Sequence, residues 1–434
     1  MAKNLLIKTL ILLFFPLAAV SLFYSYNRQA AEPANFSVES QVQEQEENLT
    51  GKPDGNQAQS QSFPAKKEQN SSNPEGQNNG NSKEDEDDVL KKKIGQMLIV
   101  GFRGSKIAEK STIGGQIESL NLGGVILFDY DNPSKGFPRN IINPEQTKTL
   151  ISGLQSFSDV PLFVSIDAEG GLINRLKEKY GFTDFPSAQY LGEKNDPALT
   201  EQTANDLGRE LKNLGFNLNF APDADVNINP DNPVIGKLER SFSNDPEKTA
   251  KQAIAFIKGL HKNNIISAIK HFPGHGSSKN DSHLGLTDVT KTYRQEELIP
   301  FQRIIEQGYA DMVMTAHIMN KTVDENYPAT LSPLFLQDIL RKQLGFQGVI
   351  ISDDMQMGAI AKNYGFQESV IKSINAGCDV LILSNNNDNY DKDIALKARD
   401  IIFEAVKNGE IKEETINNSY LRIMNLKKKF GLIE

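Results

Sequence analysis

The chain has 434 residues, 38% hydrophobic and 24% charged, so it can bury a sizeable core and hold either one large α/β barrel or about two to three average domains. Its formal net charge of −9, without a stripe of lysine and arginine, argues against a nucleic-acid partner. The single cysteine, Cys378, cannot form an intrachain disulfide, and its apolar surroundings favour a buried small residue over a nucleophile.

The amino terminus has the features of an export signal. Lys3 and Lys8 precede the uncharged apolar residues 9–27, a length close to the ~20 residues that cross a bilayer. Because the lysines favour an inside amino terminus, we predict a signal anchor over residues 1–28 that holds the exported protein in the inner membrane, facing the periplasm or the cell exterior. A cleaved signal peptide and a secreted protein are the alternative, since small residues suit a cleavage site and Pro16 weakens a continuous helix.

A polar segment follows the predicted anchor. Residues 29–88 consist mainly of Gln, Asn, Ser, Glu, Gly and Lys, and they end on the acidic run KEDEDD. Such a composition cannot bury enough apolar surface to offset the entropy of ordering. We therefore predict a disordered linker at 29–88, followed by one folded domain at 89–434.

Eight short apolar runs, separated by amphipathic segments, occupy this domain. Their near-continuous hydrophobicity is typical of parallel strands that are covered on both faces. The runs are MLIVGF (97–102), GVILFD (124–129), LFVSID (162–167), FNLNFAPDAD (216–225), IISAIKH (265–271), MVMTAH (312–317), GVIISDD (348–354) and DVLILSN (379–385). Repeated strand–helix units in this number predict a single (β/α)8 TIM-type barrel, with an open doubly wound sheet as the rival architecture.

Two of the intervening segments carry clear helix-start signals. Asp245 with Pro246, and Ser332 with Pro333, each place a capping side chain before a proline in the first turn. We expect Asp245 and Ser332 to cap the two helices that follow.

Charged and imidazole side chains stand at the carboxyl ends of the apolar runs. They are Asp167, Asp225, Lys270, His271, His317 and Asp353. In a (β/α)8 barrel these strand ends form the face on which active sites are built. General solubility does not explain the pattern, because Asp, Lys and His are costly to place beside a packed core.

Three of the five histidines lie in the segment KHFPGHGSSKNDSH, residues 270–283. His271 and His275 have the spacing of a helical metal-binding pair, but the Phe-Pro-Gly between them breaks any helix. We therefore predict no metal and no other cofactor.

The sequence Asp281-Ser282-His283 favours proton transfer instead. Residues two apart in an extended segment can point the same way, so the Asp281 carboxylate can accept a hydrogen bond from one ring nitrogen of His283. The other nitrogen can then donate a proton to a leaving group and later take one from water. The small, glycine-rich stretch before Asp281 predicts a mobile loop that closes over substrate.

These motifs together resemble the β-N-acetylglucosaminidase branch of glycoside hydrolase family 3. KHFPGHG followed by DSH matches the signature of that branch, and SIDAEGGLINRL, NFAPDADVN, LERSFSNDP, TAHI and GVIISDDM follow the family order over most of the predicted barrel. The resemblance implies a retaining mechanism with an aspartate nucleophile and a histidine acid/base.

The resemblance also implies a role for individual residues. Asp353 would be the nucleophile, with Asp354 as the competing candidate because strand alternation lets only one of them face the barrel mouth. His283 would be the acid/base, with Asp281 as its partner. The residues expected to bind the GlcNAc ring and its acetamido group are Asp167, Arg175, Arg240, Lys270 and His271. The residues expected to support them from outside the sugar contact are Asp225, His317 and Glu169. His275 is expected to brace the PGHG turn.

The function implied is a retaining exo-β-N-acetylglucosaminidase that acts, as a monomer, on GlcNAc-containing glycans such as peptidoglycan fragments. A β-N-acetylglucosaminide phosphorylase and a non-catalytic wall-glycan-binding barrel are the alternatives. Two features depart from the family pattern. Leu172 stands where an arginine often follows the paired glycines, and the amino-terminal segment argues against intracellular recycling.

Overall fold

The computed structural model of the protein describes residues 83–136, 138–387 and 389–434. The predicted signal segment, residues 1–28, and the predicted linker up to residue 82 lie outside the described residues. Within the described part of the chain, no helix combines the length and the apolar character needed to span a membrane.

Eight parallel strands close into a barrel in the order β1-β12-β11-β9-β7-β6-β3-β2. They are β1 (Leu98–Gly101), β2 (Gly124–Ile126), β3 (Phe163–Ile166), β6 (Leu218–Asn219), β7 (Ile266–Phe272), β9 (Met312–Thr315), β11 (Val349–Asp354) and β12 (Val380–Leu383). Each strand coincides with one of the eight predicted apolar runs. The predicted barrel is confirmed, and closure of the sheet excludes the open doubly wound alternative.

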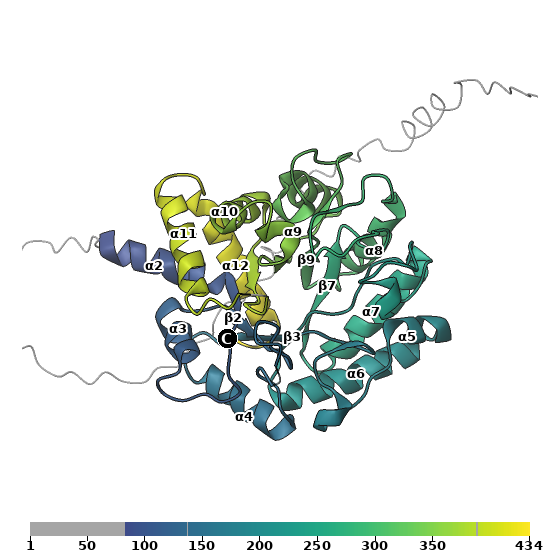
Figure 1. Cartoon of the computed structure of the whole chain (residues 1–434), viewed down its shortest axis with the longest axis horizontal. Coiled ribbons are helices and arrows are strands. Elements are labelled where there is room, and N and C mark those ends of the chain that lie inside the picture. The colour runs from purple at the N-terminus through teal and green to yellow at the C-terminus, as the bar shows by residue number, and fades with distance from the viewer. Residues whose placement is uncertain (1–82, 137, 388) are drawn as a thin grey trace, which may run out of the picture. The chain divides into compact units, whose positions relative to one another are not determined.

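Helices surround the strands of this barrel as an outer ring (Figure 1). They are α2 (Lys83–Gln96), α3 (Thr112–Leu120), α4 (Pro144–Gln155), α5 (Ala188–Lys194), α6 (Pro197–Leu214), α7 (Pro246–His261), α8 (Ile299–Glu306), α9 (Gly358–Ala361), α10 (Phe366–Ala376), α11 (Ile394–Lys407), α12 (Glu413–Lys429) and the π-helix η5 (Leu334–Gln343). Because helices cover the strands from outside and side chains fill the inside, every residue of β1 and β7 is buried.

Short elements decorate the loops between these units. Two small sheets pair β4 (Ala168–Gly170) with β5 (Ile173–Asn174) and β8 (Thr287–Asp288) with β10 (Ile318–Met319). The 3-10 turns are η1 (Glu178–Tyr180), η2 (Gly236–Leu238), η3 (Gln295–Leu298) and η4 (Ala329–Leu331). Leu172 lies at the tip of the β4–β5 hairpin with 57% of its surface exposed, where the left-handed φ of Gly171 turns the chain.

One of the two predicted helix caps is confirmed and the other is wrong. The Asp245 side chain accepts from the backbone N–H groups of Glu247 and Lys248, both in the first turn of α7. Ser332 makes no cap, because its hydroxyl donates to Asp324 Oδ2 at 2.6 Å and η5 starts without a side-chain cap. A buried carboxylate is a stronger acceptor for the hydroxyl than the helix end offers, so the tertiary contact overrides the local signal.

The first described helix, α2, begins at Lys83, within the segment expected to be linker. Acidic residues fill its first turn, which suits the positive end of the helix dipole. Asp87 pairs with Lys407 of α11 at 2.7 Å, and Lys93 donates to Asn417 of α12 at 2.7 Å. The acidic run therefore starts the helix that leads into β1.

Lys427 of α12 is fully buried at the end of the barrel where the strands begin. Its Nζ donates to Gln96 Oε1 at 2.7 Å and lies 4.7 Å from the centre of the Phe163 ring. Burial lowers the pKa of Lys427 to about 7.

This buried lysine makes the free energy of unfolding depend on pH. Between about pH 7 and the ordinary lysine pKa, the unfolded chain binds a proton that the folded chain lacks. The free energy of unfolding of the wild type should therefore rise with pH, relative to that of Lys427→Met, by up to about 1.4 kcal/mol per pH unit. Urea denaturation of both proteins at about pH 7, 8 and 9 measures the difference. The exposed neighbour variant Lys428→Met should show no such trend. A difference in the free energy of unfolding between the wild type and Lys427→Met that stays constant over this pH range would contradict the prediction.

Candidate active site

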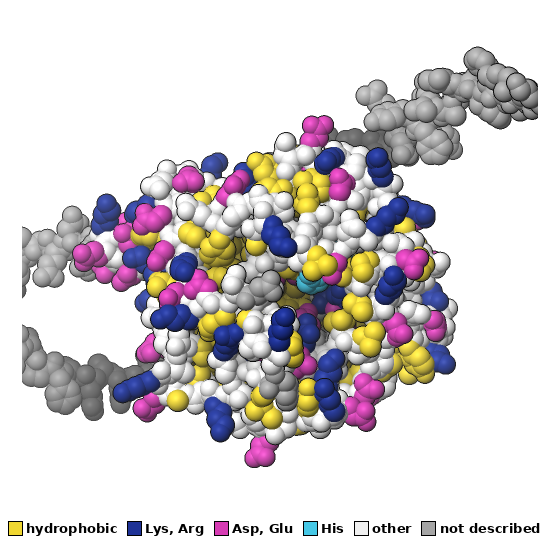
Figure 2. Space-filling view, viewed as in Figure 1, with side chains coloured by type: hydrophobic (Ala, Val, Ile, Leu, Met, Phe, Trp, Pro, Cys, Tyr) yellow, Lys and Arg dark blue, Asp and Glu magenta, His cyan; other side chains and the backbone are white. Residues whose placement is uncertain are grey.

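A cavity of about 280 Å³ lies at the carboxyl ends of the barrel strands. Its walls include all of the predicted catalytic and sugar-binding residues except Asp281: Asp167, Arg175, Arg240, Lys270, His271, His283 and Asp353. In Figure 2 a hollow opens near the centre of the face in view, with histidine and Lys or Arg side chains close to its edge. The structure thus brings together residues that are widely separated in the sequence.

A network of ion pairs forms one side of the cavity. Glu169, on β4, accepts two hydrogen bonds from Arg240, at 2.8 and 2.9 Å, and pairs with Lys270 Nζ at 2.6 Å. Lys270 also donates to Asp167 at 3.0 Å, and Asp167 pairs with Arg175 at 3.5 Å. Although burial opposes ionisation, the charges of Lys270 and Arg175 hold the pKa of Asp167 well below its usual range. These side chains are therefore fixed in charge and orientation before any ligand arrives.

Glu169 holds two buried cations in place, so removing its charge should cost stability. For Glu169→Gln we expect a loss of about 3–5 kcal/mol in the free energy of unfolding, because Arg240 and Lys270 lose their shared anion. Urea denaturation measures this loss. Glu178→Gln, on an exposed turn of the same region, is the matched control. A loss below about 1 kcal/mol would show that the network is not held by this charge.

His271 is oriented by Asp225 from behind. Its Nδ1 lies 2.7 Å from Asp225 Oδ2, and its Nε2 lies 3.2 Å from the Arg240 guanidinium. Asp225 also accepts from the backbone N–H of His275 at 2.7 Å, and despite burial these contacts lower the pKa of Asp225 to about 2. Asp225 is completely buried and is not among the residues that line the cavity, so it supports His271 from behind the wall.

Asp223 is a buried carboxyl that the sequence interpretation did not single out. Burial, together with the charge of Asp225, raises its pKa well above the usual range. Asp223, Asp225 and His271 are close enough to one another to hold a metal ion. Arg240 Nε lies 3.4 Å from Asp223 Oδ2, however, and this cation disfavours a second positive charge at the same position. Asp223 stands in the quoted motif NFAPDADVN, so the strand-end rule could have found it.

Asp353 and Asp354 both line the cavity, which corrects the expectation that strand alternation would admit only one. The register of β11 is irregular between Ile351 and Asp354, so strict alternation fails there. Asp354 is bonded to the residue that follows β12. It accepts hydrogen bonds from the Ser384 hydroxyl at 2.5 Å and from the Ser384 N–H at 2.9 Å. Burial raises the pKa of Asp354 above its ordinary value.

Asp353 has a different electrostatic environment. Burial opposes its ionisation, but the surrounding imidazoles lower its pKa below the usual range. These imidazoles are His317, His271 and His283. His317 is fully buried and joins Thr330 Oγ1, at 2.8 Å, to the carbonyl oxygen of Asp354, at 2.9 Å, so it supports the strand end from behind. Asp353 is thus a carboxylate that is ionised and available to a ligand.

His283 and Asp281 form the contact expected from their spacing. His283 Nδ1 lies 2.7 Å from Asp281 Oδ1, and the same oxygen accepts the His283 backbone N–H at 2.8 Å. Nδ1 is therefore the donor to the carboxylate, which leaves Nε2 of this cavity-lining ring for a ligand. Although partial loss of hydration opposes it, the bond to Asp281 and the charge of Asp353 raise the pKa of His283.

His275 lies away from the cavity and bridges two serines of the loop that carries His283. Its Nδ1 contacts the Ser278 hydroxyl at 2.7 Å and its Nε2 the Ser282 hydroxyl at 3.0 Å. Burial lowers the pKa of His275 to about 4, so the ring is neutral. It therefore braces the segment that follows the PGHG turn up to Ser282.

The remaining walls come from segments that the sequence interpretation left without a role. They include Phe128, Tyr130, Asn132, Met314, Met357, Asn386 and Asn387. Asn386 and Asn387 follow the eighth strand, so the strand-end rule could have found them too. Tyr130 and Asn132 lie in the loop after β2, whose path no local pattern reveals.

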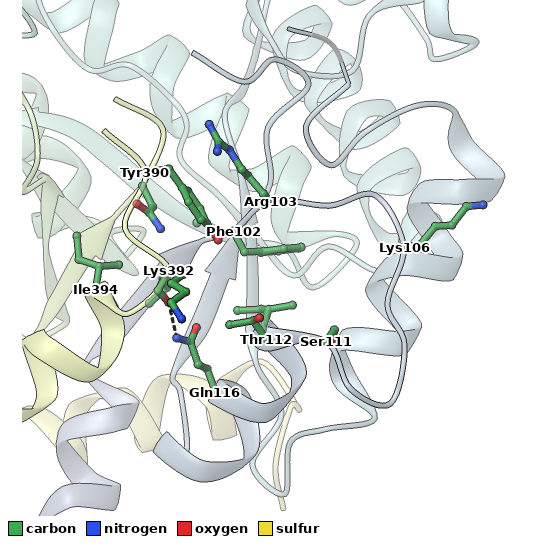
Figure 3. Close-up of a pocket in the computed structure, with 13 residues that line it drawn as sticks. Phe102, Arg103, Lys106, Ser111, Thr112, Gln116, Tyr390, Lys392 and Ile394 are labelled. Atoms are coloured by element: carbon green, nitrogen blue, oxygen red, sulfur yellow. Dashed lines mark hydrogen bonds between the residues drawn. The ribbon is translucent and has the colours of Figure 1, made fainter. Parts of the chain in front are cut away.

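A second, smaller cavity of about 110 Å³ lies between the segments that follow β1 and β12 (Figure 3). Its Arg103 is held by Asp131 through two bonds of 2.9 and 3.0 Å, and Gln116 donates to the Lys392 carbonyl oxygen at 2.6 Å. None of the predicted site residues lines it. The cavity at the strand ends, which the predicted residues line, is therefore the candidate active site.

Comparisons with known proteins identify the family of the chain. Residues 89–426 match the model of the glycosyl hydrolase family 3 N-terminal domain. The chain belongs to glycoside hydrolase family 3. The predicted family is thus confirmed, and the match covers the whole barrel.

Proteins similar to this chain carry β-hexosaminidase or β-N-acetylglucosaminidase names. The chain is 33% identical over 305 residues to a β-hexosaminidase of Nitrosomonas eutropha, covering 68% of this chain and 82% of that protein. It is 32% identical over 382 residues to β-hexosaminidase A of Pseudoalteromonas piscicida, covering 77% of this chain and 60% of that protein. A solved family 3 β-N-acetylglucosaminidase from Paenibacillus sp. str. FPU-7 is 35% identical, with a TM-score of 0.72, covering 79% of this chain and 63% of that one. The chain therefore spans about 60% of the length of the latter two relatives.

Proposed function

We propose that the protein is a retaining exo-β-N-acetylglucosaminidase that removes terminal β-linked GlcNAc from peptidoglycan fragments or other exported glycans. The observation that carries this proposal is one cavity lined by both Asp353 and His283, with His283 Nδ1 bonded to Asp281 at 2.7 Å. An ionised carboxylate and an imidazole of raised pKa are the nucleophile and the proton donor that double displacement needs. The hexosaminidase names of the family 3 relatives support the sugar class.

The reaction proceeds in two displacements. First, an oxygen of Asp353 attacks the anomeric carbon, the bond to the aglycone oxygen breaks, and that oxygen takes the proton from Nε2 of His283. Second, a water oxygen attacks the same carbon, Nε2 takes a proton from the water, and the bond to Asp353 breaks. Both groups return to their starting states, and two inversions give a product with the configuration of the substrate.

The cavity dimensions and lining support removal of a single terminal sugar. A volume of about 280 Å³ suits one sugar ring and is at the small end of ligand sites in proteins. The ion-paired Asp167, Lys270 and Arg240 offer fixed charged partners to sugar hydroxyls, and the apolar side chains of Phe128 and Met314 offer contact to a ring face.

Product analysis tests the proposed reaction. With an aryl β-GlcNAc substrate, proton NMR should detect β-GlcNAc before mutarotation. With a chitin oligosaccharide, the first products should be GlcNAc and the oligomer that is one sugar shorter, in equal amounts. An α-configured first product would contradict the retaining mechanism. Formation of GlcNAc-1-phosphate in phosphate buffer would identify a phosphorylase instead. Glycan binding without turnover would identify a non-catalytic barrel.

The pH dependence of this reaction follows from the Asp281–His283 pair. His283 must be protonated to act as the acid, and its pKa is raised, so kcat/KM should hold as the pH rises past the ordinary histidine pKa and fall only above it. Asp281→Asn weakens the bond that raises this pKa, so the alkaline limb should move to lower pH. The pH profile of kcat/KM for both proteins measures the shift. Identical alkaline limbs would show that Asp281 does not tune His283.

We also propose that the protein is exported and held by its amino-terminal segment. The support is the apolar stretch at residues 9–27 after Lys3 and Lys8, and its ~20-residue length. Fractionation of cells tests this, because an anchored protein stays with membranes after a high-salt wash. Full release into the soluble periplasmic or culture fraction would indicate a cleaved signal peptide.

A further inference from the structure

The loop that carries His283 is fastened to the segment that follows the strand of Asp353. The backbone N–H of Gly358 donates to the His283 carbonyl oxygen at 3.1 Å, and the N–H of Ala359 donates to the Ser282 carbonyl oxygen at 3.3 Å. Lys362 Nζ donates to the Leu284 carbonyl oxygen at 3.1 Å. Three consecutive carbonyl groups of the loop are thus bonded to α9 and the residue that follows it.

The approach of the loop to α9 is closest at Gly358. A Cβ atom at this position would lie 2.7 Å from the His283 carbonyl oxygen and 2.9 Å from both the carbonyl carbon and the oxygen of Leu284. Contacts below 3.0 Å are essentially never seen for real Cβ atoms, and here each partner is backbone that cannot turn aside. Gly358 does not have a left-handed φ, so its backbone conformation is open to other residues. Glycine is needed at 358 for space.

A side-chain contact also holds the loop. The Ser282 hydroxyl lies 3.0 Å from His275 Nε2, and Ser282 is almost completely buried. The His283 side chain, by contrast, is 59% exposed and lines the cavity. In this conformation the loop is held through its backbone and Ser282, and these contacts determine where the imidazole lies.

We propose that Gly358 is a positioning residue, which sets the place of the His283 imidazole relative to Asp353 by admitting the loop backbone to the surface of α9. This inference rests on the proposed function, in which His283 is the proton donor. Gly358 lies five residues after Asp353 in the sequence. The segment that carries the nucleophile therefore also determines the position of the proton donor. A small displacement of the loop removes the proton donor from the leaving group and leaves Asp353 where it is.

Gly358→Ala tests this role through the dependence of the rate on the leaving group. For a poor leaving group such as 4-methoxyphenol, which needs a proton, we expect kcat/KM to fall about tenfold or more. For 2,4-dinitrophenol, which departs without a proton, we expect a change of about threefold at most. His283→Ala should show the same selective pattern. The alkaline limb of the pH profile should also move to lower pH, because the imidazole leaves the field of Asp353.

Two glycines provide matched controls. A Cβ at Gly115, on α3, or at Gly285, within the loop itself, would meet nothing within 4 Å. Alanine at either position should therefore leave both substrates unaffected. Lys362→Met adds no bulk to the contact and removes one bond to the loop, so it should reproduce the selective loss at about two- to threefold even if Gly358→Ala folds poorly.

The outcomes separate this inference from the proposed function. Equal losses of kcat/KM with both leaving groups in Gly358→Ala would overturn the positioning role alone. The same conclusion would follow if His283→Ala showed the selective loss while Gly358→Ala and Lys362→Met behaved like the wild type. Unchanged turnover in His283→Ala would overturn the proposed function and this inference with it.

Discussion

Asp353→Ala is expected to lower kcat for aryl β-GlcNAc substrates by about 10⁴-fold or more, because the other carboxylates in the described lining already have partners. Asp167 pairs with Lys270 and Arg175, and Asp354 is bonded to Ser384. KM should change little, since Asp167, Lys270 and Arg240 keep their ion pairs. Steady-state kinetics measure both constants. Azide, which can enter the space left by the carboxylate, should restore turnover and yield an α-glycosyl azide detectable by mass spectrometry and NMR.

Asp354→Asn is the informative comparison for this variant. Asp354 holds the end of β12 through Ser384 and Asn387, so we expect its loss to lower the thermal midpoint of unfolding and to reduce kcat by less than about 10²-fold. If Asp354→Asn were the inactive variant, and Asp353→Ala retained turnover, the assignment of the nucleophile would be reversed.

His283→Ala is expected to lower kcat/KM by about 10²- to 10⁴-fold for substrates whose leaving group needs a proton. The first displacement should be nearly unaffected with a 2,4-dinitrophenyl leaving group, so a burst of phenolate should precede slow hydrolysis of the glycosyl-enzyme. Stopped-flow absorbance measures the burst. A uniform loss with every leaving group would mean that His283 acts by binding the sugar rather than by moving a proton.

The barrel was predictable from the sequence because its strands are buried on both faces. All eight apolar runs became strands of the closed sheet, and the strand-end rule located Asp167, Lys270 and Asp353 on one cavity. The Asp281–His283 contact was also predictable, since both partners lie within three residues of one another. Local patterns succeed where the interacting groups are close in sequence or share a repeated architecture.

The features that sequence reasoning missed depend on contacts between distant segments. Ser332 fails to cap its helix because Asp324 competes for its hydroxyl, and Asp354 joins Asp353 in the cavity because β11 is irregular. The contact of Gly358 with the carbonyl of His283 joins residues from two different strand–helix units, and no spacing pattern reveals it. Such features follow from how loops pack, which one sequence does not encode in any local signal.

The ion pairs of the cavity have a consequence for what can enter as the second substrate. The described part of the lining contains three permanently charged cations, Arg175, Arg240 and Lys270, and each already has a carboxylate partner. With Asp353 in place, an incoming anion would meet no permanent cation that lacks a carboxylate partner, so attraction would offset little of the hydration that the anion gives up. Uncharged acceptors bear no such cost. For the proposed reaction we therefore expect water, or the hydroxyl group of another sugar, to release the glycosyl group.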